Sequence, residues 1–279
     1  MPSPNDLPGP SAASDVPLIP DQRRESMVRQ LRRYKVLSVH QLTEMFDCSH
    51  MTVRRDIAAL EQAGLVYTVP GGVRIASHLN SEPSHQSKAL IEQPQKQAIA
   101  ACAAGFLQPG MTAYLDAGTT TLTLVPHILA LSDMTVVTND FSIVQELADA
   151  AHVTVIHTGG VLDHANRSGV GGLAAATLRQ LSIDVAFISA SSWDLRRGAT
   201  TPSAPKVEVK QAAMKGASQT VLLATSSKYG TFGLYKVAAL DHFDRVISDE
   251  GLTEAAAVGI REAGVDLAIA PQLQDASAA

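Results

Sequence analysis

The stretch Ser49–Leu60, SHMTVRRDIAAL, decides how the N-terminal part of this chain is interpreted. It opens on a serine, a residue type that caps helices. Val53, Ile57 and Leu60 follow at helical spacing, so they share one face that points into a core. The side chains left on the exposed side, near the start of the helix, are His50, Met51, Thr52, Arg54 and Arg55. A buried stripe behind a basic leading edge is typical of a DNA recognition helix, although ordinary surface helices also carry Arg-Arg pairs.

Two further helices are expected before this stretch. Arg23 to Arg33 predicts the first helix, and Ser38 with Gln41 has the spacing of a capping box that starts the second. A tight turn at residues 47–49 separates the second helix from the third. The apolar side chains expected in their core are Met27, Val28, Leu31, Val39, Leu42, Met45 and Phe46.

Two short alternating runs follow the third helix, which we expect to end at Gly64. Residues 65–69 and 73–75 flank the turn Pro70-Gly71-Gly72 and predict a β-hairpin. Such a hairpin after three helices is the wing of a winged helix.

Residues 21–75 resemble the DeoR/GlpR-type helix-turn-helix of bacterial repressors, with the helix-turn-helix proper over about residues 37–56. The resemblance is carried by the leading helix, residues 37–42, Ser49–Asp56 and Gly64–Val73. It implies that the third helix enters the major groove of double-stranded operator DNA. The expected DNA-binding residues are Ser49 as the cap; His50, Met51, Thr52 and Arg54 at base edges; and Arg55, Arg24 and Arg33 at phosphates.

The expected wing departs from the family pattern. Thr68 and Pro70 stand where the family usually has an arginine and a histidine, so Arg74 is the remaining candidate for a phosphate contact. A second interpretation of the recognition helix stays open, in which Asp56 pairs with one arginine and only holds the helix surface together.

The composition agrees with a basic DNA-binding module attached to an acidic domain. The chain has 279 residues, 46% of them hydrophobic, and a net charge of −5, yet residues 21–75 hold nine Lys/Arg against six Asp/Glu. Its two cysteines have no paired spacing, so we expect buried free thiols and a cytoplasmic protein. Residues 1–20 predict a disordered tail without a signal peptide, and no apolar run is long enough to span a membrane.

The rest of the chain alternates short apolar strands with helices. Residues 76–95 predict a linker, 96–270 an α/β effector domain and 271–279 a tail. The expected strands are at residues 112–115, 135–138, 153–157, 185–189, 220–224 and 245–248. This alternation predicts a parallel sheet with helices on both faces.

Polar clusters follow four of these strands, at residues 116–121, 138–140, 158–160 and 225–230. Ligands bind at the carboxyl ends of strands in such sheets, and glycine-rich helix starts hold phosphate. Each cluster alone is also an ordinary turn or helix cap. Because four of them occur at equivalent positions, we expect a shared anion site.

This body resembles the DeoR-type sensor domain, similar in fold to ribose-5-phosphate isomerase. The resemblance implies a phosphorylated sugar or sugar-acid effector, with the phosphate on the 118–120 loop, lysines neutralising its charge, and Asn139 and Asp116 binding hydroxyls. The expected effector-binding residues are Asp116, Gly118, Thr119, Thr120, Asn139, Gly159, Gly160, Lys210, Ser227 and Lys228. The only tryptophan, Trp193, either covers one face of the effector or packs the domain.

The sequence therefore predicts a repressor of a carbohydrate or sugar-acid catabolic operon, a homodimer or homotetramer, with coupling through residues 76–95. The alternative is a sugar-phosphate isomerase or lyase with an added DNA module. Its candidate bases are Asp116, Asp140 and Glu208. No cofactor is expected, and no metal, because the histidines lack zinc spacing.

Overall fold

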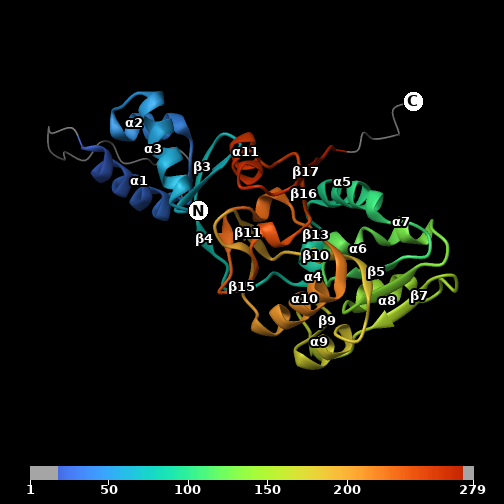
Figure 1. The fold of residues 1–279 in the computed structure, drawn as a ribbon. Helices are drawn as coiled ribbons and strands as arrows, with labels where there is room; N and C mark the ends of the chain where they lie inside the picture. The colour runs from blue at the N-terminus through green and yellow to red at the C-terminus, as the bar shows by residue number, and fades with distance from the viewer. Residues whose placement is uncertain (1–17, 273–279) are drawn as a thin grey trace. The chain divides into compact units, whose positions relative to one another are not determined.

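The computed structural model describes residues 18–272, and the chain divides into two compact units, Met1–Ala76 and Ser77–Ala279 (Figure 1). The expected tails, residues 1–20 and 271–279, fall outside the described residues except for 18–20 and 271–272. Each unit has its own core.

The first unit is a winged helix. Its helices are α1 (Pro20–Tyr34), α2 (Val39–Phe46) and α3 (His50–Gln62). Strands β2 (Val66–Val69) and β3 (Gly72–Ile75) form the expected hairpin, and β1 (Val36–Leu37) extends it in the antiparallel order β1-β3-β2. The core includes Met27, Leu31, Leu42, Val53, Ile57 and Leu60, as predicted. Met45 is an exception, because it is exposed while Phe46 packs against the core in its place.

Local hydrogen bonds explain where these helices begin and end. Ser38 Oγ accepts from the Gln41 backbone N–H, and Gln41 Oε1 accepts from the Ser38 backbone N–H, which completes the capping box. At the end of α3, Gly64 has a φ of +66° and donates to the Glu61 carbonyl, while Leu65 donates to the Leu60 carbonyl. This Schellman motif needs a left-handed residue, which is why a glycine ends the helix.

The second unit is built on a seven-stranded parallel sheet in the order β17-β16-β13-β10-β5-β6-β7. Six of its strands are at the expected positions, and β17 was not predicted. The strands are β5 (Thr112–Leu115), β6 (Thr135–Thr138), β7 (Thr154–His157), β10 (Ile183–Ser189), β13 (Ala217–Leu223), β16 (Arg245–Asp249) and β17 (Leu267–Ala270). The strand order reverses between β5 and β10, and this reversal is the topological switch point of the sheet.

Helices cover both faces of this sheet. Helix α5 (Gln93–Ala103) packs on β13, β16 and β17, whereas α10 (Ala204–Gly216) packs on β10 and β13, and Figure 1 shows them on opposite sides. The remaining helices are α6 (Thr119–Leu122), α7 (Val125–Leu129), α8 (Phe141–Leu147), α9 (Gly172–Leu178), α11 (Glu254–Glu262) and the 3-10 turns η1 (Ala104–Phe106), η2 (Ser226–Lys228) and η3 (Leu240–His242).

Short strands outside the main sheet were not predicted. Strands β11 (Ser192–Asp194), β12 (Gly198–Thr201) and β15 (Tyr235–Ala238) form an antiparallel sheet, and β8 (Val161–Asp163) pairs with β9 (Ser168–Val170). Strand β4 (Ser77–His78) pairs with β14 (Thr231–Phe232). With helix α4 (His85–Ala89), β4 makes the expected linker an integral part of the second unit.

The two cysteines are free but only partly buried. Burial raises the pKa of both thiols, which keeps them in the unreactive protonated form.

Candidate DNA interface and effector site

The exposed side of α3 carries the predicted base-reading residues. His50, Met51, Arg54 and Arg55 are all exposed, and Met51 is 68% exposed. Within residues 18–272, neither Arg54 nor Arg55 takes part in an ion pair. The helix therefore presents two uncompensated guanidinium groups, which can bond guanine edges or phosphates.

The first turn of α3 is fixed by Ser49. Its hydroxyl oxygen accepts from the Thr52 backbone N–H at 3.2 Å and lies 2.9 Å from the Thr52 hydroxyl. Both hydroxyls therefore already serve the cap, while His50 and Met51 project from the same turn without such a role.

The buried carboxylate of the helix, Asp56, pairs with the first helix. Arg23 Nε lies 2.5 Å from Asp56 Oδ2, and Arg24 Nη1 lies 3.7 Å from Asp56 Oδ1. Asp56 is 2% exposed, so it joins α1 to α3 inside the unit. Asp56 does pair with an arginine, as the second interpretation had it, but this arginine is Arg23 of α1 and not Arg54 or Arg55 of α3.

The predicted phosphate contacts differ in how available they are. Arg33 is exposed, with its guanidinium over the Tyr34 ring. Arg24 already pairs with Asp21 and Asp56. Arg74 is half-buried opposite Tyr67 in the wing, and burial lowers the pKa of its guanidinium.

Thr68, one of the two departures in the wing, has a structural use. Its backbone N–H and its hydroxyl donate to the two carboxylate oxygens of Glu61, at 3.0 and 2.8 Å. The wing is thereby tied to α3 at the position where the family usually has a charged side chain.

In the second unit, Asp116 and Lys210 meet at the switch point of the sheet. Asp116 follows β5, and its Oδ2 accepts from the Ser189 backbone N–H at 2.9 Å, from the Ser189 hydroxyl at 2.7 Å and from Lys210 Nζ. Asp116 is 2% exposed and Lys210 is 5% exposed. Their buried ion pair therefore joins α10 to the carboxyl ends of β5 and β10.

Asn139 orders the loop after β5. Its Oδ1 accepts from the Tyr114 hydroxyl and the Ala117 backbone N–H, and its Nδ2 donates to the Gly169 carbonyl. The Gly118 backbone N–H donates to Asp140 Oδ2 at 3.0 Å. Asn139 and Gly118 are thus already bonded within the protein.

The threonines of the 118–120 loop lie against the same centre. Thr119 and Thr120 are buried at the start of α6. The Thr120 hydroxyl is buried and lacks a hydrogen-bond partner among the described residues. A buried hydroxyl without a partner is costly, so it marks a position where a ligand oxygen would be stabilised.

Gly159 and Gly160 are not brought to this centre by any contact of the described residues. Both have positive φ angles and form the turn between β7 and β8. A Cβ on Gly160 would lie 2.8 Å from the Val170 carbonyl oxygen, so this glycine is required by close backbone packing.

Five lysines from four elements gather around β10 and its following loop. We call this group, Lys88, Lys96, Lys206, Lys210 and Lys228, the lysine cluster. Lys206 pairs with Glu82 and with Asp163, the latter at 3.3 Å, and Lys88 lies 3.6 Å from Glu82. Lys96 donates to the carbonyls of Lys88 and Ile91, and Lys228 donates to the Ala190 carbonyl at 2.9 Å.

The lysine cluster has more positive than negative charge. Among the described residues its five ammonium groups pair with three carboxylates, and Lys96 and Lys228 form no ion pair. Burial lowers the pKa of Lys88, Lys96 and Lys228, and with the neighbouring Lys88 it brings the pKa of Lys228 to about 8. An anion placed among these lysines would offset the free-energy cost of burying their charged ammonium groups.

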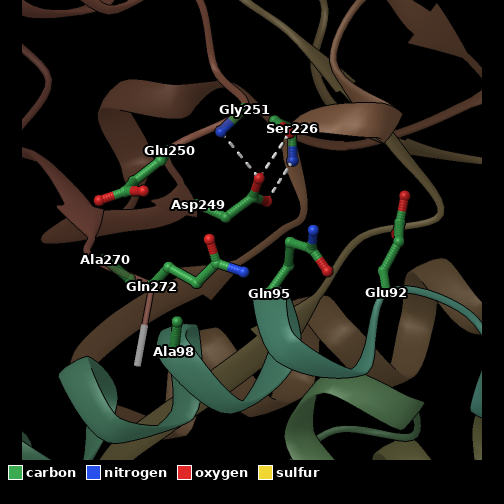
Figure 2. Close-up of a pocket in the computed structure, with 9 residues that line it drawn as sticks. All are labelled: Glu92, Gln95, Ala98, Ser226, Asp249, Glu250, Gly251, Ala270 and Gln272. Atoms are coloured by element: carbon green, nitrogen blue, oxygen red, sulfur yellow. Dashed lines mark hydrogen bonds between the residues drawn. The ribbon is translucent and has the colours of Figure 1, made fainter. Parts of the chain in front are cut away.

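A cavity of about 280 Å³ opens beside the lysine cluster, at the carboxyl ends of β16 and β17 (Figure 2). Gln95 and Gln272 line it together with three acidic residues, Glu92, Asp249 and Glu250, and Figure 2 shows both amides at the cavity. Glu92 precedes α5, which carries Lys96, and Ser226 begins the turn η2, which ends at Lys228, so two segments of the cavity wall also carry lysines of the cluster. Ser227, although predicted at the site, is exposed.

Sequence reasoning missed Glu82, Lys88, Lys96 and Lys206. A signal existed for Lys206, which precedes Lys210 by one helical turn and shares its face. Trp193, for which two roles were open, is fully buried and donates to the Thr225 carbonyl at 3.1 Å, so it packs the domain. Residues 18–272 contain no His, Cys, Asp and Glu group that could hold a metal ion, and no helix long and apolar enough to cross a membrane.

A winged helix followed by an α/β unit defines a DNA-binding transcriptional regulator. Residues 23–78 match the model of the DeoR-like helix-turn-helix domain, and residues 91–250 match that of the DeoR C terminal sensor domain. The chain belongs to the DeoR family of transcriptional regulators.

Its relatives are regulators too. The uncharacterized HTH-type transcriptional regulator YgbI of Escherichia coli K12 is 44% identical over 91% of this chain and 99% of that protein. A putative aga operon transcriptional repressor of Escherichia coli O157:H7 is 29% identical over 88% of this chain and 92% of that protein. The chain is therefore a regulator and not an enzyme.

The solved structures that are similar include that of a D-ribose-5-phosphate isomerase in complex with phospho-erythronic acid. It is 16% identical, with a TM-score of 0.36, over 48% of this chain and 52% of that chain. A likeness of this size does not define a ligand.

Proposed function

We propose that this protein is a cytoplasmic repressor of a carbohydrate or sugar-acid catabolic operon, and that a phosphorylated sugar or sugar acid controls its operator affinity. The observation that carries the effector is the lysine cluster, in which buried positive charge exceeds negative charge next to a cavity. Phosphate is the group that matches such a site in charge.

The operator-binding part of the proposal rests on α3. Arg54 and Arg55 are exposed beside His50 and Met51, and the helix is anchored from behind by Asp56. This arrangement suits insertion of the N-terminal half of α3 into the major groove. Arg33 is the best placed of the predicted phosphate contacts, because Arg24 and Arg74 are engaged within the unit.

In the sensor unit, we assign the phosphate to the lysine cluster together with Thr120, and the rest of the effector to the cavity. Lys228 and Lys96 would neutralise the phosphate. Gln95 and Gln272 would bond the hydroxyl groups. Asp116, Asn139 and Gly118 would hold the loop in shape rather than contact the effector directly, because their polar atoms are already bonded.

The functional form is proposed to be a homodimer or homotetramer. Helix-turn-helix proteins read repeated half-sites with two copies of the recognition helix. Sedimentation of the full-length protein measures this assembly directly.

The proposal is tested with the full-length protein and DNA selected by it from a random library. Gel-shift titration is repeated with a panel of sugar phosphates and sugar-acid phosphates, and with their unphosphorylated forms as matched controls. The expected result is that one phosphorylated compound changes operator affinity about 5- to 150-fold and its unphosphorylated form does not. If no phosphorylated compound changes the affinity, control by this class of metabolite is wrong.

A further inference from the structure

Glu82 connects the start of the second unit to the lysine cluster. It lies six residues after Ala76, the last residue of the first unit. We call residues 77–91 the connecting segment. The chain must pass through this segment to reach the DNA-binding unit.

The Glu82 carboxylate is held by three groups of the cluster and its surroundings. Oε2 accepts from Lys206 Nζ, Oε1 accepts from the Ser191 hydroxyl, and Lys88 Nζ lies 3.6 Å from Oε1. Its side chain is 13% exposed. Although burial opposes it, Lys88 and Lys206 lower the pKa of Glu82 to about 2, so it is ionised at neutral pH.

We propose that Glu82 occupies an anion position of the lysine cluster as an internal substitute for the effector, and that a phosphorylated effector displaces it and releases the connecting segment. This inference rests on the proposed function, because it assumes that the cluster binds the effector's phosphate.

The Glu82 carboxylate and the effector's phosphate should compete, because both are anions that bind the same lysines. Lys206 and Lys88 are the lysines that hold Glu82, Lys96 Nζ donates to the Lys88 carbonyl, and the Lys88 ammonium group lowers the pKa of both Lys96 and Lys228. A phosphate that draws in Lys88 and Lys206 removes the partners of Glu82. Two anions that compete for the same cations weaken each other by the same factor.

Displacement of Glu82 would loosen the connecting segment at one of its attachments to the body. Other attachments are the β4–β14 pairing, the His85 backbone N–H on the Ala165 carbonyl, Lys88 on Asn166 at 2.5 Å, and Lys96 Nζ on the carbonyls of Lys88 and Ile91. Lys88 thus belongs both to the connecting segment and to the cluster. A ligand on the cluster would therefore act on the segment at two residues, Glu82 and Lys88.

The experiment uses full-length protein and inorganic phosphate. Calorimetry gives the phosphate affinity, and hydrogen exchange followed by mass spectrometry gives the protection of the connecting segment. For Glu82→Gln we expect phosphate to bind about 5- to 150-fold more tightly than to the wild type. We also expect the segment to exchange without phosphate as fast as the phosphate-saturated wild type.

Asp163→Asn is the matched control. It removes the other carboxylate of Lys206 and changes the charge by the same amount, but it lies on β8 outside the connecting segment. Asp163→Asn should increase the affinity for phosphate without increasing the rate of hydrogen exchange in the connecting segment. Ser191→Ala removes one bond to Glu82 without a change of charge, so it tests the inference with an intermediate effect if Glu82→Gln does not fold.

The possible failures are distinguishable. If phosphate binds but the exchange of residues 77–91 is unchanged by phosphate and by Glu82→Gln, displacement is wrong and the effector site stands. If Asp163→Asn loosens the segment as much as Glu82→Gln, loss of charge pairing in general is responsible, and the inference is overturned. If neither the wild type nor either carboxamide variant binds phosphate at millimolar concentration, the proposed effector site itself fails.

Discussion

The two units handle positive charge in opposite ways. On α3, Arg54 and Arg55 are exposed and form no ion pair among the described residues, whereas in the sensor unit Lys206 and Lys210 are buried and bonded to carboxylates. Exposed charge suits a large polyanion that is recognised from outside. Buried positive charge that is paired with internal carboxylates suits a small anion. Such an anion must displace a carboxylate in order to bind, so its binding changes the contacts within the protein.

The largest expected effect tests the buried side of this comparison. Lys210→Met leaves the Asp116 carboxyl, which is 2% exposed, without its cation, so the free energy of unfolding should fall by about 3–5 kcal/mol in denaturant titration. Arg245→Met is the control, because it removes an ion pair with Asp266 that is largely exposed. We expect it to cost at most ~1 kcal/mol. Equal losses would remove the distinction between the two kinds of charge.

The next prediction tests the exposed side. Arg54→Ala and Arg55→Ala should each weaken binding to the selected DNA by about 1–3 kcal/mol, enough to abolish specific binding in gel shifts. Thermal unfolding should be unchanged, because both side chains are exposed. Arg179→Ala, an exposed arginine of the sensor unit, controls for the loss of one positive charge. Unaltered DNA affinity in either α3 variant would contradict the assignment.

Dependence on pH should separate the two sites. Sulfate, whose charge is constant in this range, should bind the lysine cluster with even affinity up to pH 8, the approximate pKa of Lys228. Above pH 8 the affinity should fall by up to about tenfold per pH unit, because the bound state requires the protonated lysine. DNA binding through arginines should stay flat, since they do not titrate there. Lys228→Met should remove the decline in sulfate binding, and a decline that persists would assign it to another group.

The smallest expected effect concerns the serines that cap the N-termini of α2 and α3. Ser38→Ala and Ser49→Ala each remove a helix cap, and each should lower the free energy of unfolding by about 1 kcal/mol. Because Ser49 starts the recognition helix and Ser38 does not, only Ser49→Ala should also weaken DNA binding. An equal loss of DNA affinity in both variants would show that Ser49 acts only through stability.

The sequence was most informative where the residues that act together are contiguous. Ser49–Leu60 contains the cap, the core stripe and the basic edge of α3 within one helix, so local periodicity was enough. Six strands of the main sheet could also be predicted, because each is an apolar run, whereas β17 was missed although its four residues, Leu267–Ala270, form such a run too. The short strands outside the main sheet were missed, since they contain two to four residues and depend on distant partners.

The effector site was harder to predict because its parts come from distant segments. The loop residues Asp116, Gly118 and Asn139 could be found from their place after strands. Glu82 and Lys88 lie in a polar segment that resembled a linker, and only tertiary contacts reveal their ion pairs with the body. Met45 shows a similar limit on a small scale, because helical spacing predicted both Met45 and Phe46 in the core, whereas only Phe46 packs against it.

The location of strand β4 has a practical consequence for protein engineering. A sensor fragment that began at residue 96, after the linker expected from the sequence, would lack β4, α4 and Glu82 and leave β14 without its partner strand. The natural junction at which to replace the DNA-binding unit by another one is between Ala76 and Ser77. A chimera joined there, with a DNA-binding head of known operator in front of an intact sensor unit, would let a reporter gene report the metabolite to which this unit responds.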